Sequence, residues 1–202
     1  MASWKVLQLE VPRYMSTLKE LDLSFCRQVN GRIVQEVLCS VPTLEVFHAD
    51  YITGTDLDNS RPWVCVGLQH LTLAFVLVSE KVRLRVFHRL STLTKLRTLK
   101  LDMFSVLHYG DGGLTPIPVA KATQQCLQFS LLKGMGMLIN LKLLRVLRGP
   151  FCEQTVWKMT EAQWVLSHWP NLEAVEGIRM EARVDQFLRE RIRVLHYLTL
   201  NT

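Results

Sequence analysis

The chain has 202 residues, of which 49% are hydrophobic and 21% are charged, and its formal net charge is +6. This composition supplies a core for one folded domain and excludes an intrinsically disordered chain. The longest apolar run, residues 71–78, is too short to span a bilayer, and the first residues lack the apolar run of a signal peptide.

Residues 18–26, Leu-Lys-Glu-Leu-Asp-Leu-Ser-Phe-Cys, form the first complete copy of a pattern that recurs along the chain. The pattern is L-x-x-L-x-L-x-x-C. Side chains alternate between the two faces of a strand, so Leu21 and Leu23 point into a core whereas Glu20 and Asp22 point to solvent. One such unit cannot bury its own apolar face, so several units must stack.

Later copies of the pattern follow at near-regular intervals. They begin at Leu44, Leu68, Leu96, Leu141, Leu172 and Leu195, and residues 4–9 resemble an earlier, incomplete copy. We assign Leu144 and Val146 to the fifth copy, and Leu198 and Leu200 to the last. Recurrence about every 20–29 residues is typical of leucine-rich repeats. The sequence therefore predicts an α/β leucine-rich repeat solenoid, with a parallel strand ladder on the concave face and helices on the convex face. The residues expected to stack in neighbouring repeats include Leu21, Leu71, Leu99 and Leu144.

Helices are expected between several of these strands, because apolar residues recur at helical spacing behind a capping residue. Asn30 and Ser79 each precede such a stripe, and residues 160–163, Thr-Glu-Ala-Gln, have the form of a capping box. The expected helices are residues 31–39, 80–90, 160–169 and 180–191. Trp63, between the second and third copies, is expected to fill the core rather than to present a ligand platform.

One interval, from Leu96 to Leu141, is 45 residues long and carries an irregular insertion at about residues 106–126 of the single domain 1–202. Its loop, residues 108–118, contains three Gly and two Pro but matches neither common phosphate-binding glycine motif. Two interpretations stay open: a tolerated insertion, or a projecting loop that contacts a partner. Residues 126–131 alternate apolar side chains as a short strand does, and residues 134–138 predict a weak helical turn.

The five cysteines, at positions 26, 39, 65, 126 and 152, are expected to be reduced and to hold no metal. Their number is odd, and the chain has no C-x-x-C pair and no His or Cys pair at zinc-ligand spacing. Reduced thiols suit a cytoplasmic or nuclear protein. No cofactor motif is present. Two catalytic alternatives, His108 with Cys126 and His48 with Asp50, lack a third group, so the sequence predicts a protein that is not an enzyme.

The candidate functional residues are strand side chains expected to point away from the core, onto the concave face that solenoids commonly use for binding. They are Glu20, Asp22, His48, Asp50, His70, Thr72, Lys100, Asp102, Arg145 and Glu176. Their mixed charges suit a protein partner better than nucleic acid; the alternative is that they are merely solvated. Basic residues cluster instead in the expected helices, around 81–89 and 183–193, as solvated faces or phosphate contacts.

Three segments resemble parts of fungal F-box and leucine-rich-repeat proteins: residues 61–68 (RPWVCVGL), 126–131 (CLQFSL) and 159–173 (MTEAQWVLSHWPNLE). The resemblance implies a ribonuclease-inhibitor-like arc that recognises a protein substrate for an SCF ubiquitin ligase. An F-box is a helical segment that precedes the repeats and docks the Skp adaptor. None is visible here, so Skp binding is expected only if an F-box lies outside this chain. Two alternatives stay open: a repeat-only scaffold with no ubiquitin link, and a nucleic-acid-binding adaptor.

Overall fold

The computed structural model describes residues 16–26, 28–57, 61–76, 79–101, 127–149 and 155–196. Within these residues, seven strands form one sheet in which each strand lies beside the next one along the chain. The strands are β1 (Glu20–Asp22), β2 (Val46–Thr53), β3 (His70–Val76), β4 (Thr98–Lys100), β5 (Val146–Arg148), β7 (Ala174–Glu176) and β9 (Val194–His196). Every pairing in the sheet is parallel. The chain is therefore a mixed α/β protein built on a parallel sheet. A second, two-stranded sheet pairs β6 (Val156–Trp157) with β8 (Arg179–Met180).

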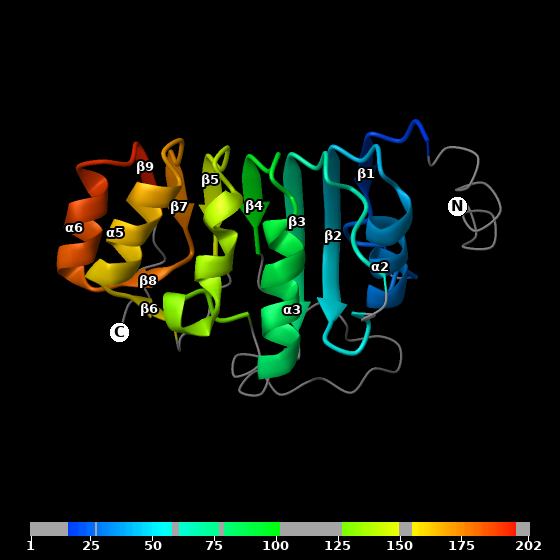
Figure 1. The fold of residues 1–202 in the computed structure, drawn as a ribbon, viewed down its shortest axis with the longest axis horizontal. Helices are drawn as coiled ribbons and strands as arrows, with labels where there is room; N and C mark the ends of the chain where they lie inside the picture. Colours follow the sequence, from blue (N-terminus) through cyan, green and yellow to red (C-terminus); the bar gives the residue numbers. More distant parts are fainter. Residues whose placement is uncertain are drawn as a thin grey trace.

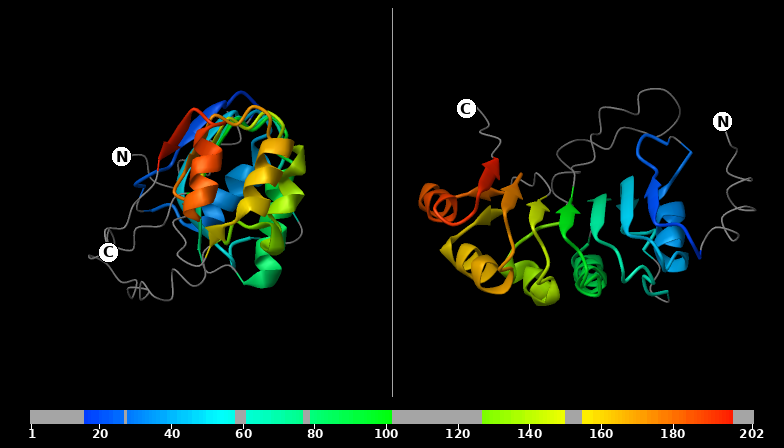
Figure 2. Two further views of the ribbon diagram at one scale, coloured as in Figure 1. Left: turned by 90° about the vertical axis from the view of Figure 1, so that its left-hand side faces the viewer. Right: turned by 90° about the horizontal axis from the view of Figure 1, so that it is seen from above.

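The helices of the described residues cover one side of the large sheet (Figure 1). They are α2 (Gly31–Ser40), α3 (Glu80–Ser91), the 3-10 helices η2 (Leu131–Lys133) and η3 (Met135–Asn140), α5 (Met159–His168) and α6 (Ala182–Arg189). Figure 2 shows the sheet curving, with the strands along the inner side of the curve and the helices along the outer side. We call the strand side, which the helices leave uncovered, the inner face.

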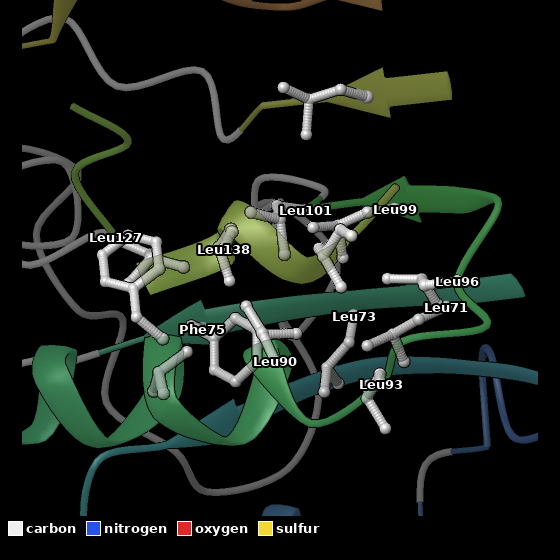
Figure 3. Close-up of a cluster of buried hydrophobic side chains, with 14 of the residues drawn as sticks. Leu71, Leu73, Phe75, Leu90, Leu93, Leu96, Leu99, Leu101, Leu127 and Leu138 are labelled. Atoms are coloured by element: carbon white, nitrogen blue, oxygen red, sulfur yellow. The ribbon is translucent and has the colours of Figure 1, made fainter. Parts of the chain in front are cut away.

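A row of apolar side chains from the middle of each strand packs beneath the helices. Its members in register are Leu21, Phe47, Leu71, Leu99, Leu147 and Val175. The four in the middle of this row are fully buried. Figure 3 shows Leu71 and Leu99 of the sheet in one cluster with Leu90 of α3 and Leu138 of η3. Because side chains alternate along a strand, burying this row leaves its neighbours to point onto the inner face.

The register of β5 corrects the fifth copy of the pattern, which we had placed at Leu141, Leu144 and Val146. Leu99 pairs with Leu147, so the copy is shifted by three residues and Leu144 takes its first position. Its third position is Gly149, where an added Cβ would lie 2.3 Å from Cγ1 of Ile178. Because Ile178 occupies this space, a leucine cannot stand there, and the pattern that would have identified the copy is broken.

The last copy is shifted in the same way. Val175 pairs with Leu195 in the middle position, so Leu195 does not begin the copy. The buried residue three positions earlier, Ile192, takes the first position instead. Leu198 and Leu200 lie outside the described residues, as do the incomplete copy at residues 4–9 and the loop 108–118.

Two of the expected helix caps are confirmed and the third is wrong. Asn30 Oδ1 accepts the N–H of Ile33 at 3.2 Å before α2, and Ser79 Oγ accepts the N–H of Val82 at 3.4 Å before α3. The helix α5 begins at Met159, one residue before Thr160, and Lys158 is its N-cap. Glu161 Oε2 accepts the Lys158 N–H at 3.1 Å, so the carboxylate at the third helical position, rather than Gln163, supplies the reciprocal half of a capping box.

The predicted strand at residues 126–131 is not formed in its described part, residues 127–131. Leu127 and Phe129 are nevertheless buried, and the Phe129 carbonyl accepts the indole N–H of Trp157 at 2.8 Å. A side chain thus satisfies a backbone group that a neighbouring strand would otherwise pair. The weak helical turn predicted at 134–138 is the 3-10 helix η3.

The linker between β2 and β3 contains no helix in its described residues, 54–57 and 61–69. Trp63 lies in this linker with 4% of its surface exposed, which confirms that it fills the core. Its indole N–H donates to Gln35 Oε1 of α2 at 3.1 Å, and the Arg89 guanidinium of α3 lies 5.8 Å from its ring centre. Trp63 therefore occupies the place on the outer layer between α2 and α3.

Candidate protein-binding face

Two rows of outward-pointing side chains cross the inner face, one on each side of the buried row. The first consists of Glu20, Val46, His70, Thr98, Val146 and Ala174; the second consists of Asp22, His48, Thr72, Lys100, Arg148 and Glu176. Parallel pairing in a constant register places equivalent residues of neighbouring strands side by side, about 4.8 Å apart. The polar side chains of six strands are thereby collected on one surface.

A third row borders these two, one residue before each strand. We call it the flanking row; it consists of Lys19, Glu45, Gln69, Arg97, Arg145 and Glu173. The Lys19 carbonyl accepts the N–H groups of Glu45 and Val46 at 2.7 and 2.9 Å, and the next carbonyls of the row, up to that of Arg145, repeat this arrangement. These paired hydrogen bonds fix the register in which the inner face is assembled.

Most of the candidate residues lie in the first two rows, where the alternation rule predicted them. They are Glu20, Asp22, His48, His70, Thr72, Lys100 and Glu176. Asp102 lies outside the described residues. The remaining two, Asp50 and Arg145, have environments that differ from the expectation.

Arg145 lies in the flanking row rather than on a strand, because the copy that contains it is shifted by three residues. Its guanidinium binds the carboxylate of Glu173, with Nη2 2.7 and 3.0 Å from the two oxygens. The position expected for Arg145 is held by Arg148, whose Nε lies 3.1 Å from Glu176 Oε2. Sequence reasoning missed Arg148, although Leu147 beside it continues the three-residue spacing of Leu141 and Leu144.

Asp50 supports a turn instead of standing free on the inner face. The register of β2 shifts between His48 and Tyr51, and both carboxylate oxygens of Asp50 lie 3.1 Å from the Phe25 backbone nitrogen, whose N–H they accept. Asp22 Oδ1 accepts the Ser24 N–H at 2.8 Å, and this bond holds the pKa of Asp22 below its usual value. Two carboxylates therefore brace the turn that follows β1.

Phe25, at the centre of that turn, is a residue that sequence reasoning missed. Its φ is +60°, the one positive φ on a residue other than glycine in the described chain, and 83% of its surface is exposed. Such a conformation costs a bulky residue about 1–2 kcal/mol. The N–H bonds to Asp50 offset part of this cost and hold the ring out into solvent.

Two histidines of the inner face, His48 and His70, lie on the adjacent strands β2 and β3. His48 is in register with Asp22 on one side and Thr72 on the other. Partial burial and the nearby Arg97 guanidinium lower the pKa of His70 below its usual value. His70 is therefore neutral at pH 7 and able to donate and to accept a hydrogen bond.

The described residues contain no group of three or more His, Cys, Asp or Glu side chains placed to hold a metal ion. Cys39 and Cys65 are buried thiols and Cys26 is an exposed one, whereas Cys126 and Cys152 are not described. Burial raises the pKa of the Cys65 thiol to about 12, so it stays protonated at neutral pH. No described helix is both long and apolar enough to cross a lipid bilayer.

No protein-family model matches the chain, and no curated protein matches it. The function proposed below therefore rests on the geometry and chemistry of the inner face and on the sequence resemblance.

Proposed function

We propose that this chain is a non-catalytic protein-recognition module of the leucine-rich-repeat type, a ribonuclease-inhibitor-like solenoid that binds its partner on the inner face. The observation that carries the proposal is the alignment of polar side chains from six parallel strands on a face that the helices leave uncovered. Repeat proteins commonly bind on such a concave surface. Thr72 and Thr98, near its centre, are half-buried and uncharged, so a partner can cover them without burying an unpaired charge.

The resemblance to F-box proteins sharpens the proposal. On that basis the module is the substrate-binding repeat region of an SCF ubiquitin ligase receptor in the cytoplasm or nucleus. A repeat-only scaffold with no ubiquitin link is the second candidate. Isolation of the full-length gene product from its own cells separates the two, because only the ligase receptor co-purifies with the Skp adaptor.

The binding face is tested by adding bulk to it. The variant Thr72→Arg/Thr98→Arg places two long side chains on the inner face, and Gln163→Arg/Gln186→Arg adds the same two side chains at exposed positions of α5 and α6. Both variants are expected to melt cooperatively, like the wild type. In quantitative mass spectrometry of affinity-purified protein, the partner should be lost from the first variant and retained by the second. Equal retention by both variants contradicts the proposal.

A nucleic-acid adaptor is the weaker candidate. The inner face carries Glu20 and Asp22 beside its cations, and a phosphate backbone is repelled by such carboxylates. Retention on immobilised nucleic acid that falls steeply as salt rises would favour this candidate over protein recognition.

A further inference from the structure

Four charged side chains of the inner face form no ion pair within the described residues. Glu20 and Asp22 belong to β1, whereas Arg97 directly precedes β4 and Lys100 ends it. Glu20, Asp22 and Arg97 are exposed and Lys100 is half-buried. We call Glu20 with Asp22 the acidic pole and Arg97 with Lys100 the basic pole.

The other charges on this surface are compensated by neighbours. Lys19 lies 2.8 Å from Glu45 in the flanking row. Beyond the basic pole, Arg145 and Arg148 pair with Glu173 and Glu176. Asp50 of β2, beside the acidic pole, accepts the Phe25 N–H. The two poles are thus charges of opposite sign that no ion pair compensates.

Several side chains between the poles carry no formal charge at pH 7, and the two carboxylates there, Glu45 and Asp50, are bound to Lys19 and to the Phe25 N–H. Val46, Gln69 and Thr72 carry no charge, and the lowered pKa of His70 keeps its ring neutral. These groups offer hydrogen bonds and an apolar contact but no competing ion. A ligand that crosses from β1 to β4 therefore meets an acidic site, a neutral middle and a basic site in that order.

The distance between the poles sets the length of the ligand. Three inter-strand spacings separate β1 from β4, which is about 14 Å. An extended chain advances about 3.3 Å per residue, so about four residues cover this distance, and residues i and i+4 of an extended chain point to the same side. A basic and an acidic side chain at that separation reach the two poles together.

We propose that the inner face binds an extended protein segment that carries a basic and an acidic side chain about four residues apart. This inference rests on the proposed function, which it deepens by naming the partner's chemistry. A segment of one charge sign meets repulsion at one pole, and a nucleic acid is repelled by the acidic pole, so charge complementarity selects the dipolar segment.

Selection from a displayed library of random 12-residue peptides against the full chain tests this inference. The peptides enriched on the wild-type protein should share a basic and an acidic residue separated by three to five positions. On the variant Arg97→Glu/Lys100→Glu, the enriched peptides should lose the acidic residue. The neutral variant Arg97→Gln/Lys100→Gln serves the same purpose if the charge reversal does not fold.

A matched control reverses two lysines elsewhere. Lys81 lies on α3 and Lys95 in the turn after it, and both are exposed. A synthetic peptide of the wild-type consensus should bind Arg97→Glu/Lys100→Glu about tenfold more weakly and Lys81→Glu/Lys95→Glu unchanged. Its affinity for the wild type should also fall as the salt concentration is raised from about 50 to about 500 mM, because salt screens interactions between exposed charges.

The outcomes separate this inference from the proposed function. If the enriched peptides lack the charge pattern but no longer bind the variant Thr72→Arg/Thr98→Arg, the inference of a dipolar segment is wrong. The proposal of protein recognition on the inner face is then unaffected. Enriched peptides indifferent to every inner-face variant overturn both. A consensus that binds the two charge-reversed proteins equally well also overturns the dipolar segment.

Discussion

The linker from β2 to β3 and the linker from β3 to β4 cover the same side of the sheet by different means. The second forms α3, which has a serine cap and a stripe of buried apolar residues. In the first, residues 61–65 contain no helix, and the Trp63 ring is buried instead. Yet the register beneath them is the same, with Phe47, Leu71 and Leu99 side by side.

The comparison shows that the outer side of the sheet must be covered by packed side chains, and that a helix is not the only element that can supply them. The helix α3 is specified locally, by Ser79 and by the helical spacing of its apolar residues. The place of Trp63 is specified by tertiary contacts, because its hydrogen-bond partner Gln35 and the Arg89 guanidinium over its ring belong to two different helices. Substitutions should therefore act on the two linkers with different magnitudes.

The largest effect is expected at the linker without a helix. Trp63→Ala should lower the free energy of unfolding by about 3–5 kcal/mol, because removing the buried indole leaves a cavity between α2 and α3. Trp63→Phe keeps most of the volume and loses the hydrogen bond to Gln35, so its cost should be smaller, about 1–2 kcal/mol. Urea denaturation measures both, and a loss below about 1 kcal/mol for Trp63→Ala would show that the indole does not support this layer.

A third linker, which holds η2 and η3, extends the comparison to the register of β5. Leu147 is fully buried in line with Leu99, whereas Val146 is partly exposed on the inner face. Leu147→Ala should cost about 2–5 kcal/mol, as should the reference variant Leu99→Ala, and Val146→Ala should cost less than about 1 kcal/mol. If denaturation curves give the reverse order for Leu147 and Val146, the strand has the other register.

The locally specified linker should respond by an intermediate amount. Ser79→Ala removes the oxygen that accepts the Val82 N–H and should cost about 0.5–2 kcal/mol. Asn30→Ala, at the equivalent cap of α2, should cost a similar amount. Lys81→Ala, at an exposed position of the first turn of α3, is the control and should change stability by less than about 0.5 kcal/mol. Thermal melts resolve these differences; no effect at Ser79 would mean that tertiary packing alone holds α3.

The turn after β1 differs from all three linkers because its backbone is strained. Glycine adopts a positive φ without the steric cost that a Cβ brings. Phe25→Gly should therefore be more stable than Phe25→Ala by about 1 kcal/mol, the opposite of the order in a helix. Paired denaturant melts of the two variants test this, and a more stable alanine variant would be inconsistent with the left-handed conformation.

The smallest effect concerns pH. The folded-state pKa of His70 lies below its unfolded value, so the unfolded chain takes up this proton first as pH falls. The contribution of His70 to stability is present above about pH 6.5 and is lost as pH falls toward the folded-state pKa. From pH 7 to pH 5, the free energy of unfolding of the wild type should therefore fall relative to that of His70→Gln. A difference that does not change with pH would place His70 in a fully solvated site.

The sequence alone predicted the elements that are specified over a few residues. Helices α2 and α3 were predicted from their caps and stripes, and strands β1 to β4 were predicted from alternating apolar residues. The same alternation placed Glu20, Asp22, His48, His70, Thr72, Lys100 and Glu176 on one surface. These predictions succeed because the periods of strand and helix are properties of the local backbone.

Features that depend on contacts between segments distant in the chain follow from tertiary packing. Leu141, Leu144 and Leu147 fill the first two positions of the pattern in either of two registers. The third position favours the wrong one, because it is Val146 there and Gly149, packed against Ile178, in the register that the strand adopts. The same register exchanges Arg145 for Arg148 on the inner face, and a carboxylate 25 residues away holds the strained turn at Phe25. Such contacts join residues whose separation along the chain carries no local signal, so packing selects an arrangement that the sequence pattern by itself does not specify.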